Sequence, residues 1–109
     1  MAAPTIVNEG THAITGETEV DVYTTTTPGY YWVKIDENDI DSASALTLRI
    51  YMIVISGGVY RKFLEEPITG SRVGWGGLSN PMGSSYGWKF SIQRTAGTVD
   101  SIPYIVEKS

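Results

Sequence analysis

The strongest constraint on the fold lies in the segment from Arg49 to Phe63, RIYMIVISGGVYRKF. Apolar side chains occupy every position from Tyr51 to Ile55. A strand with one face in the core and the other in water alternates apolar and polar residues, because successive side chains point to opposite faces. We therefore expect a strand over residues 46–56 whose second face is also covered, either by a loop of the same chain or by another subunit.

Further segments rich in β-branched and aromatic residues, bounded by glycine and proline, predict more strands. The expected strands cover residues 17–25, 30–36, 46–56, 59–66, 86–95 and 101–107, and Ile6, Val7 and Ile14 indicate one more near the N-terminus. No segment predicts a helix longer than a single turn, which we expect in the polar stretch 37–44. Pro103 predicts an edge position for the last strand, because proline cannot donate a ladder hydrogen bond.

These elements predict a single all-β domain, an antiparallel β-sandwich of about seven or eight strands. Its topology is either a jelly roll or immunoglobulin-like. We expect the sandwich to cover residues 17–109, with a glycine-rich loop at 67–85. Residues 1–16 form either an N-terminal arm or an extra strand. At 109 residues the domain is large enough for a core without disulfides, and the chain has no cysteine.

Gly57 and Gly58 predict a two-residue hairpin turn between residues 46–56 and 59–66. This register places Arg49 opposite Glu66, Tyr51 opposite Leu64 and Met52 opposite Phe63. One face of the hairpin then belongs to the core: Leu46, Leu48, Ile50, Met52, Val54 and Phe63. The other face mixes aromatic and aliphatic side chains, a composition typical of protein interfaces. We interpret it as a self-association face: Tyr51, Ile53, Ile55, Tyr60 and Leu64.

Catalytic motifs give little support for an enzyme. Residues 83–87 match the G-x-S-x-G nucleophile elbow, but a strand is expected to follow them and His12 is the only histidine. The acidic run from Asp36 to Asp41 offers oxygen ligands without the spacing of a calcium loop. The glycines around Trp75 precede no helix that would bind phosphate. We expect a protein without catalytic residues, cofactor or metal site.

The formal net charge of −4 is unevenly distributed. Residues 1–45 hold eight acidic side chains and one lysine, a net −7, whereas residues 46–109 hold four acidic and seven basic side chains, a net +3. The acidic balance argues against nucleic-acid binding, which needs a concentrated basic surface. No apolar run is long enough to cross a bilayer, and residues 1–13 do not resemble a signal peptide. We expect a soluble protein that is used without secretion and without a membrane.

Three segments, TTPGYYWVKIDENDI, LTLRIYMIVISGGVYRKF and WKFSIQRTAGTVDSIPYIV, resemble small proteins encoded among the virion genes of tailed phages. The resemblance covers residues 20–106 and departs in the loop 67–85. It implies a capsid decoration or cement protein that binds the major capsid protein at the virion surface after synthesis in the host cytoplasm. A homo-oligomer, either a dimer or a trimer, is expected, and Arg72 and Trp75 in the loop are candidates for contact with the capsid or another ligand.

Two alternatives stay open at this stage. A carbohydrate-binding or adhesin module would stack sugars on aromatic side chains, for which the candidates are Tyr30, Tyr31, Trp32, Trp75, Tyr86 and Trp88. Large aromatic residues on strands more often fill the space between sheets, so Trp75 is the strongest of these candidates. A small tail or connector component would assemble into rings instead of binding a capsid lattice.

Overall fold

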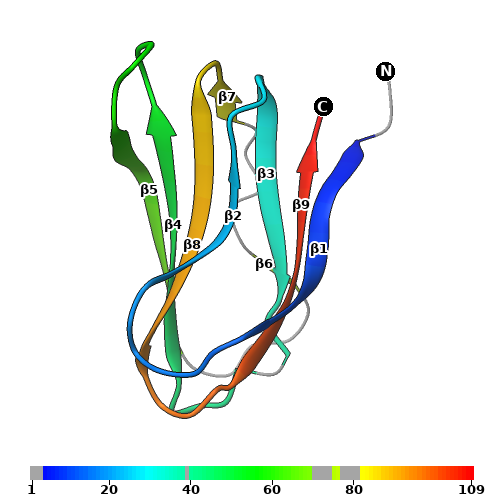
Figure 1. The fold of residues 1–109 in the computed structure, drawn as a ribbon. Coiled ribbons are helices and arrows are strands. Elements are labelled where there is room, and N and C mark those ends of the chain that lie inside the picture. Colours follow the sequence, from blue (N-terminus) through cyan, green and yellow to red (C-terminus); the bar gives the residue numbers. More distant parts are fainter. Residues whose placement is uncertain (1–3, 39, 70–74, 77–81) are drawn as a thin grey trace.

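The computed structural model describes residues 4–38, 40–69 and 82–109, together with the backbone of residues 75–76. These residues form nine strands and no helix, which confirms the predicted all-β sandwich (Figure 1). The strands are β1 (Thr5–Ala13), β2 (Val20–Thr25), β3 (Gly29–Asp36), β4 (Ala45–Ile53), β5 (Tyr60–Thr69), β6 (Trp75–Gly76), β7 (Met82–Ser84), β8 (Gly87–Ala96) and β9 (Ser101–Lys108).

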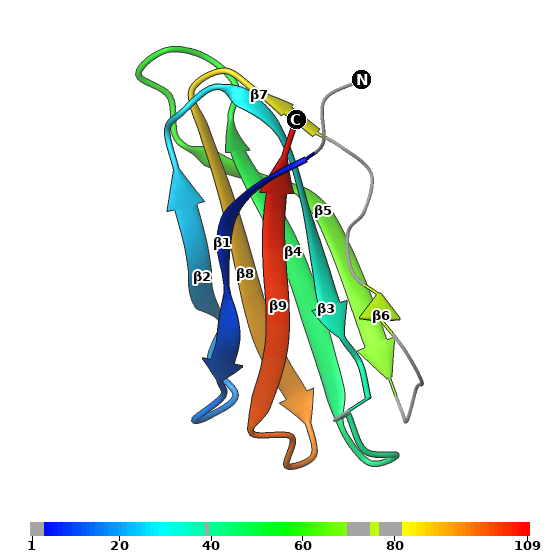
Figure 2. The same cartoon turned by 90° about the vertical axis from the view of Figure 1, so that its right-hand side faces the viewer.

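The first half of the chain pairs with the second half in reverse order. β4 pairs with β5, β3 with both β6 and β7, β2 with β8 and β1 with β9, all antiparallel. This long hairpin is rolled up, so that β3 also pairs with β9 and β4 with β8. The resulting sheets have the orders β1-β9-β3-β6, with β7 beside β3, and β2-β8-β4-β5 (Figure 2). This is the strand order of a jelly roll, not of an immunoglobulin-like sandwich.

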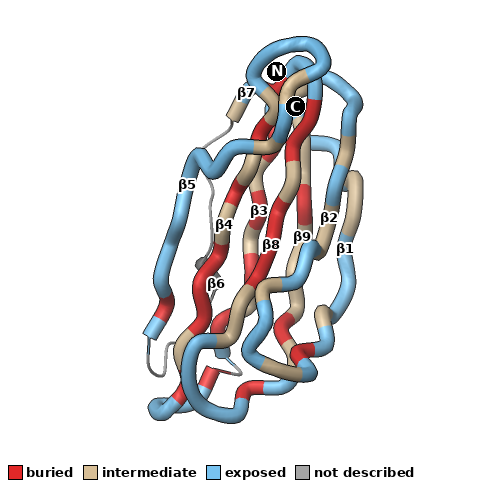
Figure 3. The backbone as a smooth tube through the Cα atoms, turned by 60° about the vertical axis from the view of Figure 1, so that its left-hand side comes forward, coloured by how far each residue is buried: buried red, intermediate tan, exposed pale blue. Residues whose placement is uncertain are grey.

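The core lies between the two sheets and is formed by alternate residues of the four central strands. The buried residues of these strands are coloured red along the backbone tube in Figure 3. Trp88 of β8 stacks on Tyr31 of β3, with ring centroids 5.2 Å apart, and this pair links the two layers. The fully buried core residues on the central strands are Tyr31, Val33, Ile35, Leu46, Leu48, Ile50, Trp88, Phe90, Ile92, Ile102 and Val106.

The hairpin between β4 and β5 differs from the predicted one. β4 ends at Ile53, and residues 54–59 form a six-residue loop. Within it the Gly58 N–H donates to the Ile55 carbonyl, with N and O 2.9 Å apart, and Gly57 has φ +75°. A positive φ at the third position is typical of a type II turn and favours glycine. The two glycines therefore belong to a turn that starts at Ile55, not to a two-residue connection.

The predicted register of this hairpin is also wrong. Arg49 lies opposite Glu65, and Tyr51 lies opposite Lys62. Between these pairs Phe63 is an extra residue in a β-bulge, and it is 50% exposed. Val54, which lies beyond the end of β4, is 59% exposed. The predictions of Phe63 and Val54 as core residues were therefore wrong.

Two prolines occupy positions opposite to those expected. Pro103 lies in β9, a central strand between β1 and β3. It is tolerated there because the ladder between β3 and β9 covers residues 104–108 of β9 and does not include Pro103. The true edge proline is Pro67, which lies in β5 and not in a loop. The predicted loop 67–85 is thus interrupted by strands, and its residues 70–74 and 77–81 lie outside the described part.

Two smaller expectations concern the ends of the strands. Residues 5–13 form β1, so within the described chain this segment is a strand and not a free arm. The predicted helical turn at 37–44 is absent from the described residues. Asp41 instead closes a turn, accepting a hydrogen bond on Oδ1 from the Ala43 N–H and one on its carbonyl oxygen from the Ser44 N–H.

Glycine-to-alanine substitutions test the turn that connects β8 and β9. Gly97 has φ +79°, and a Cβ there would overlap the Ser44 hydroxyl and lie 2.5 Å from the Ser44 Cα. That hydroxyl accepts hydrogen bonds from the N–H groups of Thr98 and Val99. We expect Gly97→Ala to lower the free energy of unfolding by about 2–4 kcal/mol, because it adds both backbone strain and overpacking. Urea denaturation would measure the change.

Two matched controls separate strain from steric overlap. Gly57→Ala has the positive φ but open space around the new Cβ, so we expect a loss of about 1–2 kcal/mol. Gly16→Ala has neither, so we expect a change within about 0.5 kcal/mol. Equal effects at Gly97 and Gly57 would contradict the described packing of Ser44.

Candidate functional site

Three residues of the predicted self-association face lie together on the outer face of the β2-β8-β4-β5 sheet. Tyr51 and Ile53 project from β4, and Tyr60 of β5 lies directly opposite Ile53. All three are half-buried. Ile53 and Tyr60 pack over Gly87 of β8, where a Cβ would lie 2.9 Å from each side chain. Glycine at position 87 therefore permits this close packing.

Individual side chains from neighbouring segments of the same chain cover Tyr51. The Lys89 ammonium lies 4.8 Å from the centre of the Tyr51 ring and 4.7 Å from that of Tyr60, within the range of a cation–π interaction. The Tyr51 hydroxyl donates a 2.6 Å hydrogen bond to the carboxylate of Glu19, which precedes β2. The Ser91 hydroxyl donates to the same carboxylate oxygen. The second face of β4 is thus covered at Tyr51 by β8 and by the segment before β2.

Arg49 extends this cover into a polar network. Its Nε donates to Glu65 Oε1 at 2.8 Å, and its NH1 group donates to Gln93 Oε1 at 2.7 Å. The same NH1 group lies 3.4 Å from Glu19 Oε1. Lys62 forms an ion pair with the other oxygen of Glu65 at 3.1 Å. The outer face is therefore more polar at its centre than the apolar run of the sequence indicated, and less suited to a dry contact between subunits.

The network holds the pKa of the Glu19 carboxyl below its ordinary value. Burial alone would raise this pKa, but hydrogen bonds from Ser91 and Tyr51 and the positive charge of Arg49 outweigh it. The bond to Glu19 in turn raises the pKa of the Tyr51 hydroxyl. The ionised carboxylate is thus the form that the fold favours.

Acidification should weaken the fold through Glu19. A carboxylate with a lowered folded-state pKa contributes stability that is present above the unfolded pKa of about 4.3 and is lost as the pH falls through the folded value. We expect Glu19→Gln to lower the free energy of unfolding by about 1 kcal/mol at pH 7, a figure reduced for solvent screening. The difference from wild type should shrink by pH 3. Urea denaturation at pH 7 and pH 3 measures the two free energies of unfolding. Glu17→Gln, at an exposed position, is the control. An equal loss at pH 7 and pH 3 would contradict an electrostatic role.

The hairpin tip, defined as residues 54–59, is the most exposed apolar segment described. Val54 is 59% exposed, Ile55 68% and Val59 61%. The tip projects from the end of the sandwich where β3 begins (Figures 1 and 3). Arg61 follows the tip in the chain. A hollow at the tip is lined by Val54, Ile55, Gly58, Val59 and Arg61. Scattered exposed aliphatic residues are ordinary, but a contiguous group marks an interaction site.

Other apolar side chains surround the hairpin tip. A small hollow of about 150 Å³ is lined by Val54 and Phe63 from the hairpin, by Gly83 and Ser84 of β7 and by Ser85 of the turn between β7 and β8. Tyr86, in the same turn, is also exposed. We call the hairpin tip together with Phe63 and Tyr86 the apolar end.

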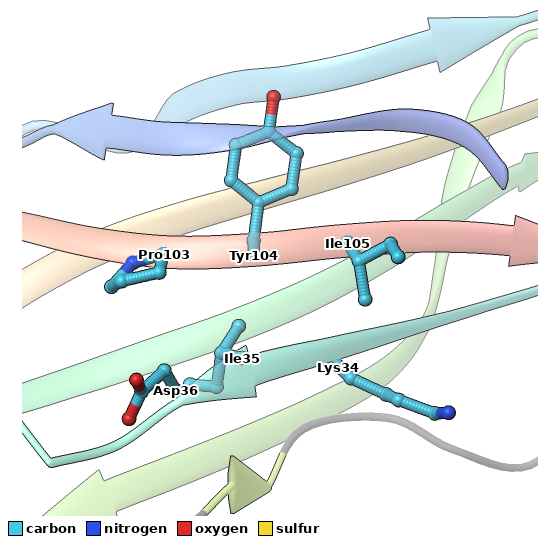
Figure 4. A pocket seen from close by; sticks show the side chains of 6 residues that line it. All are labelled: Lys34, Ile35, Asp36, Pro103, Tyr104 and Ile105. Atoms are coloured by element: carbon cyan, nitrogen blue, oxygen red, sulfur yellow. The ribbon is translucent and has the colours of Figure 1, made fainter.

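A third hollow lies on the β1-β9-β3-β6 sheet, where β3 ends and β9 begins. The β3–β9 hollow has a volume of about 420 Å³ and is lined by Lys34, Ile35 and Asp36 of β3 and by Pro103, Tyr104 and Ile105 of β9 (Figure 4). Its size is within the range of small-ligand pockets. The neighbours Val33, Ile102 and Val106 are buried in the core, so alternation directs Lys34, Pro103 and Ile105 to the outside. Sequence patterns gave no signal for this hollow, because β3 and β9 are far apart in the chain.

The remaining predicted residues are dispersed. Ile55 lies on the hairpin tip, and Leu64 lies opposite Ile50, on the inner side of β5. Arg72 and the side chain of Trp75 lie outside the described residues. Of the aromatic platform, Tyr31 and Trp88 are buried in the core, and the half-buried Trp32 donates from Nε1 to Glu107. Tyr30 and Tyr86 are exposed.

Comparisons with family models, with curated proteins and with solved structures find no match to this chain. The resemblance to phage virion proteins therefore stays a prediction. Within the described ranges, no helix is long and apolar enough to span a membrane. Among the same residues, no three acidic, histidine or cysteine side chains are grouped as metal ligands would be.

Proposed function

We propose that this protein is a structural component of a tailed-phage particle, a decoration protein that binds the major capsid lattice and stabilises it. The observation that carries the proposal is the apolar end, where three aliphatic side chains of the hairpin tip are each more than half exposed. Burial of apolar surface against another protein contributes roughly 25 cal/mol per Å². An exposed cluster of this kind suits a protein that acts by adhesion.

Two further considerations support the phage context. The resemblance to small virion proteins covers residues 20–106, which include β2 to β8 and most of β9. Jelly rolls also occur in viral capsid domains, although they occur in lectins too, and this is an analogy at the level of the fold alone. The protein would then be located at the capsid surface as a homo-oligomer.

The alternatives receive different support. A sugar-binding platform is weakened because Tyr31 and Trp88, two of its six candidate residues, are fully buried. A small tail or connector component is compatible with the same apolar end, since ring assembly also needs an exposed contact surface. The two virion roles differ in where the protein is found on the particle.

Purified particles of the phage that encodes this chain provide the test. We expect an antibody against the protein to label the capsid, and particles that lack it to release DNA at a lower temperature. Added wild-type protein should restore the release temperature. Ile55→Asn should bind such particles at least tenfold more weakly, because a polar side chain is then buried in an apolar contact.

Ile6→Asn is the matched control, since Ile6 is also an exposed isoleucine, 53% exposed, but lies on β1. It should bind like wild type. If particles purified from the wild-type phage do not contain the protein, the proposal is overturned. Labelling confined to the tail would replace the capsid role by the tail or connector role.

A further inference from the structure

We infer that the hairpin tip of one molecule docks into the β3–β9 hollow of a second copy, so that chains associate head to tail. This goes beyond the proposed function, because it gives the hairpin tip a second copy as its partner and leaves Phe63 and Tyr86 of the apolar end for the capsid. A tip variant would then bind the particle more weakly because it binds as a monomer. The two surfaces complement each other in apolar character and in charge.

The hairpin tip is an apolar knob with positive charge behind it. Val54, Ile55 and Val59 are exposed at its apex. The strand segments that lead into and out of the tip, from Ile50 to Leu64, contain Arg61 and Lys62 and no acidic residue. Lys62 is paired with Glu65, whereas no ion pair of Arg61 occurs within the described part of the chain. Arg61 is therefore available to a carboxylate on a partner.

The β3–β9 hollow is apolar with a negative rim. Pro103 and Ile105 present outward-facing apolar side chains to the hollow, whereas the side chains of Ile35 and Tyr104, which also line it, pack against the core. Asp36 lies at the rim on β3, and Glu9 of β1 lies directly opposite Ile105 on the other side. Lys34, the one cation of the lining, forms an ion pair with Glu107 at 3.0 Å. The rim thus keeps a net negative charge that matches Arg61.

The position of the two surfaces requires a second molecule. The tip extends from the end of the sandwich where β3 begins, and Asp36 is the last residue of β3, toward the opposite end (Figure 1). The tip also belongs to the β2-β8-β4-β5 sheet and the hollow to the other sheet. A tip cannot reach the hollow of its own chain. Because the two contact surfaces differ, the contact is heterologous, and it closes into a ring or continues as a filament.

Mixing two variants tests this geometry. Ile55→Asp disables the tip and Ile105→Asp disables the hollow. We expect the mass of the wild-type protein, measured by light scattering on a sizing column, to increase with concentration. Each variant alone should be monomeric, with association at least tenfold weaker. An equimolar mixture should form one-to-one complexes and nothing larger, because the intact hollow of the tip variant accepts the intact tip of the hollow variant.

A charge exchange keeps the test decisive if Ile105→Asp fails to fold. Arg61→Asp and Asp36→Arg should each weaken association at least tenfold, and the two changes in one chain should restore it. Circular dichroism verifies that each variant has the wild-type fold. Tyr51→Asp on the outer face should leave association unchanged.

Three results would overturn the inference. The first is a wild-type monomer at all concentrations, and the second is a mixture of the two variants that stays monomeric. The third is association that is lost in Tyr51→Asp and kept in Ile55→Asp, which would assign the contact to the outer face. A monomer that still binds the phage particle overturns this inference alone. An oligomer that is absent from the particle overturns the proposed function alone.

Discussion

The rest of the structure depends on β4, which is paired on both edges and covered on both faces. β5 and β8 complete its backbone hydrogen bonds, and its inner face carries Leu46, Leu48 and Ile50 into the core. On the outer face Arg49 contacts β5 through Glu65, β8 through Gln93 and the segment before β2 through Glu19. One guanidinium therefore joins three parts of the sheet. The side chains of the apolar run therefore lie in three places, which are the core, the covered outer face and the exposed tip.

Most strands were predictable because their cause is local. Alternation in residues 86–95 reflects a strand with one face in the core, and Trp88, Phe90 and Ile92 are buried as expected. The β4–β5 register was not predictable from the glycine pair, because the turn begins at Ile55 and the bulge at Phe63 changes the pairing. A bulge leaves no mark in a period-two pattern. The edge position predicted from Pro103 was wrong for a similar reason. A proline is acceptable in this central strand only because the ladder with β3 does not include it, and the sequence does not show the length of that ladder.

The candidate surfaces were predictable only in part. Tyr51, Ile53 and Tyr60 do lie together, since hairpin partners are neighbours whatever the exact register. Their cover was not predictable, because Glu19 and Lys89 come from other strands or loops. The β3–β9 hollow likewise needs two strands that meet only after the long hairpin has rolled up. The proposed virion role rests on a resemblance between sequences, and the proposed adhesion rests on the exposure of the hairpin tip.

The pairing of β1 with β9 has a consequence for synthesis. β1 is synthesised before β9, so at about 5–20 residues per second β1 waits on the order of ten seconds for its partner in the sheet. During that time a neighbouring molecule whose β9 is already complete offers the same backbone partners. Close spacing of such chains would favour the exchange of β1 between them, which is domain swapping. The order in which strands leave the ribosome, and not only their final contacts, would then decide how many chains fold alone.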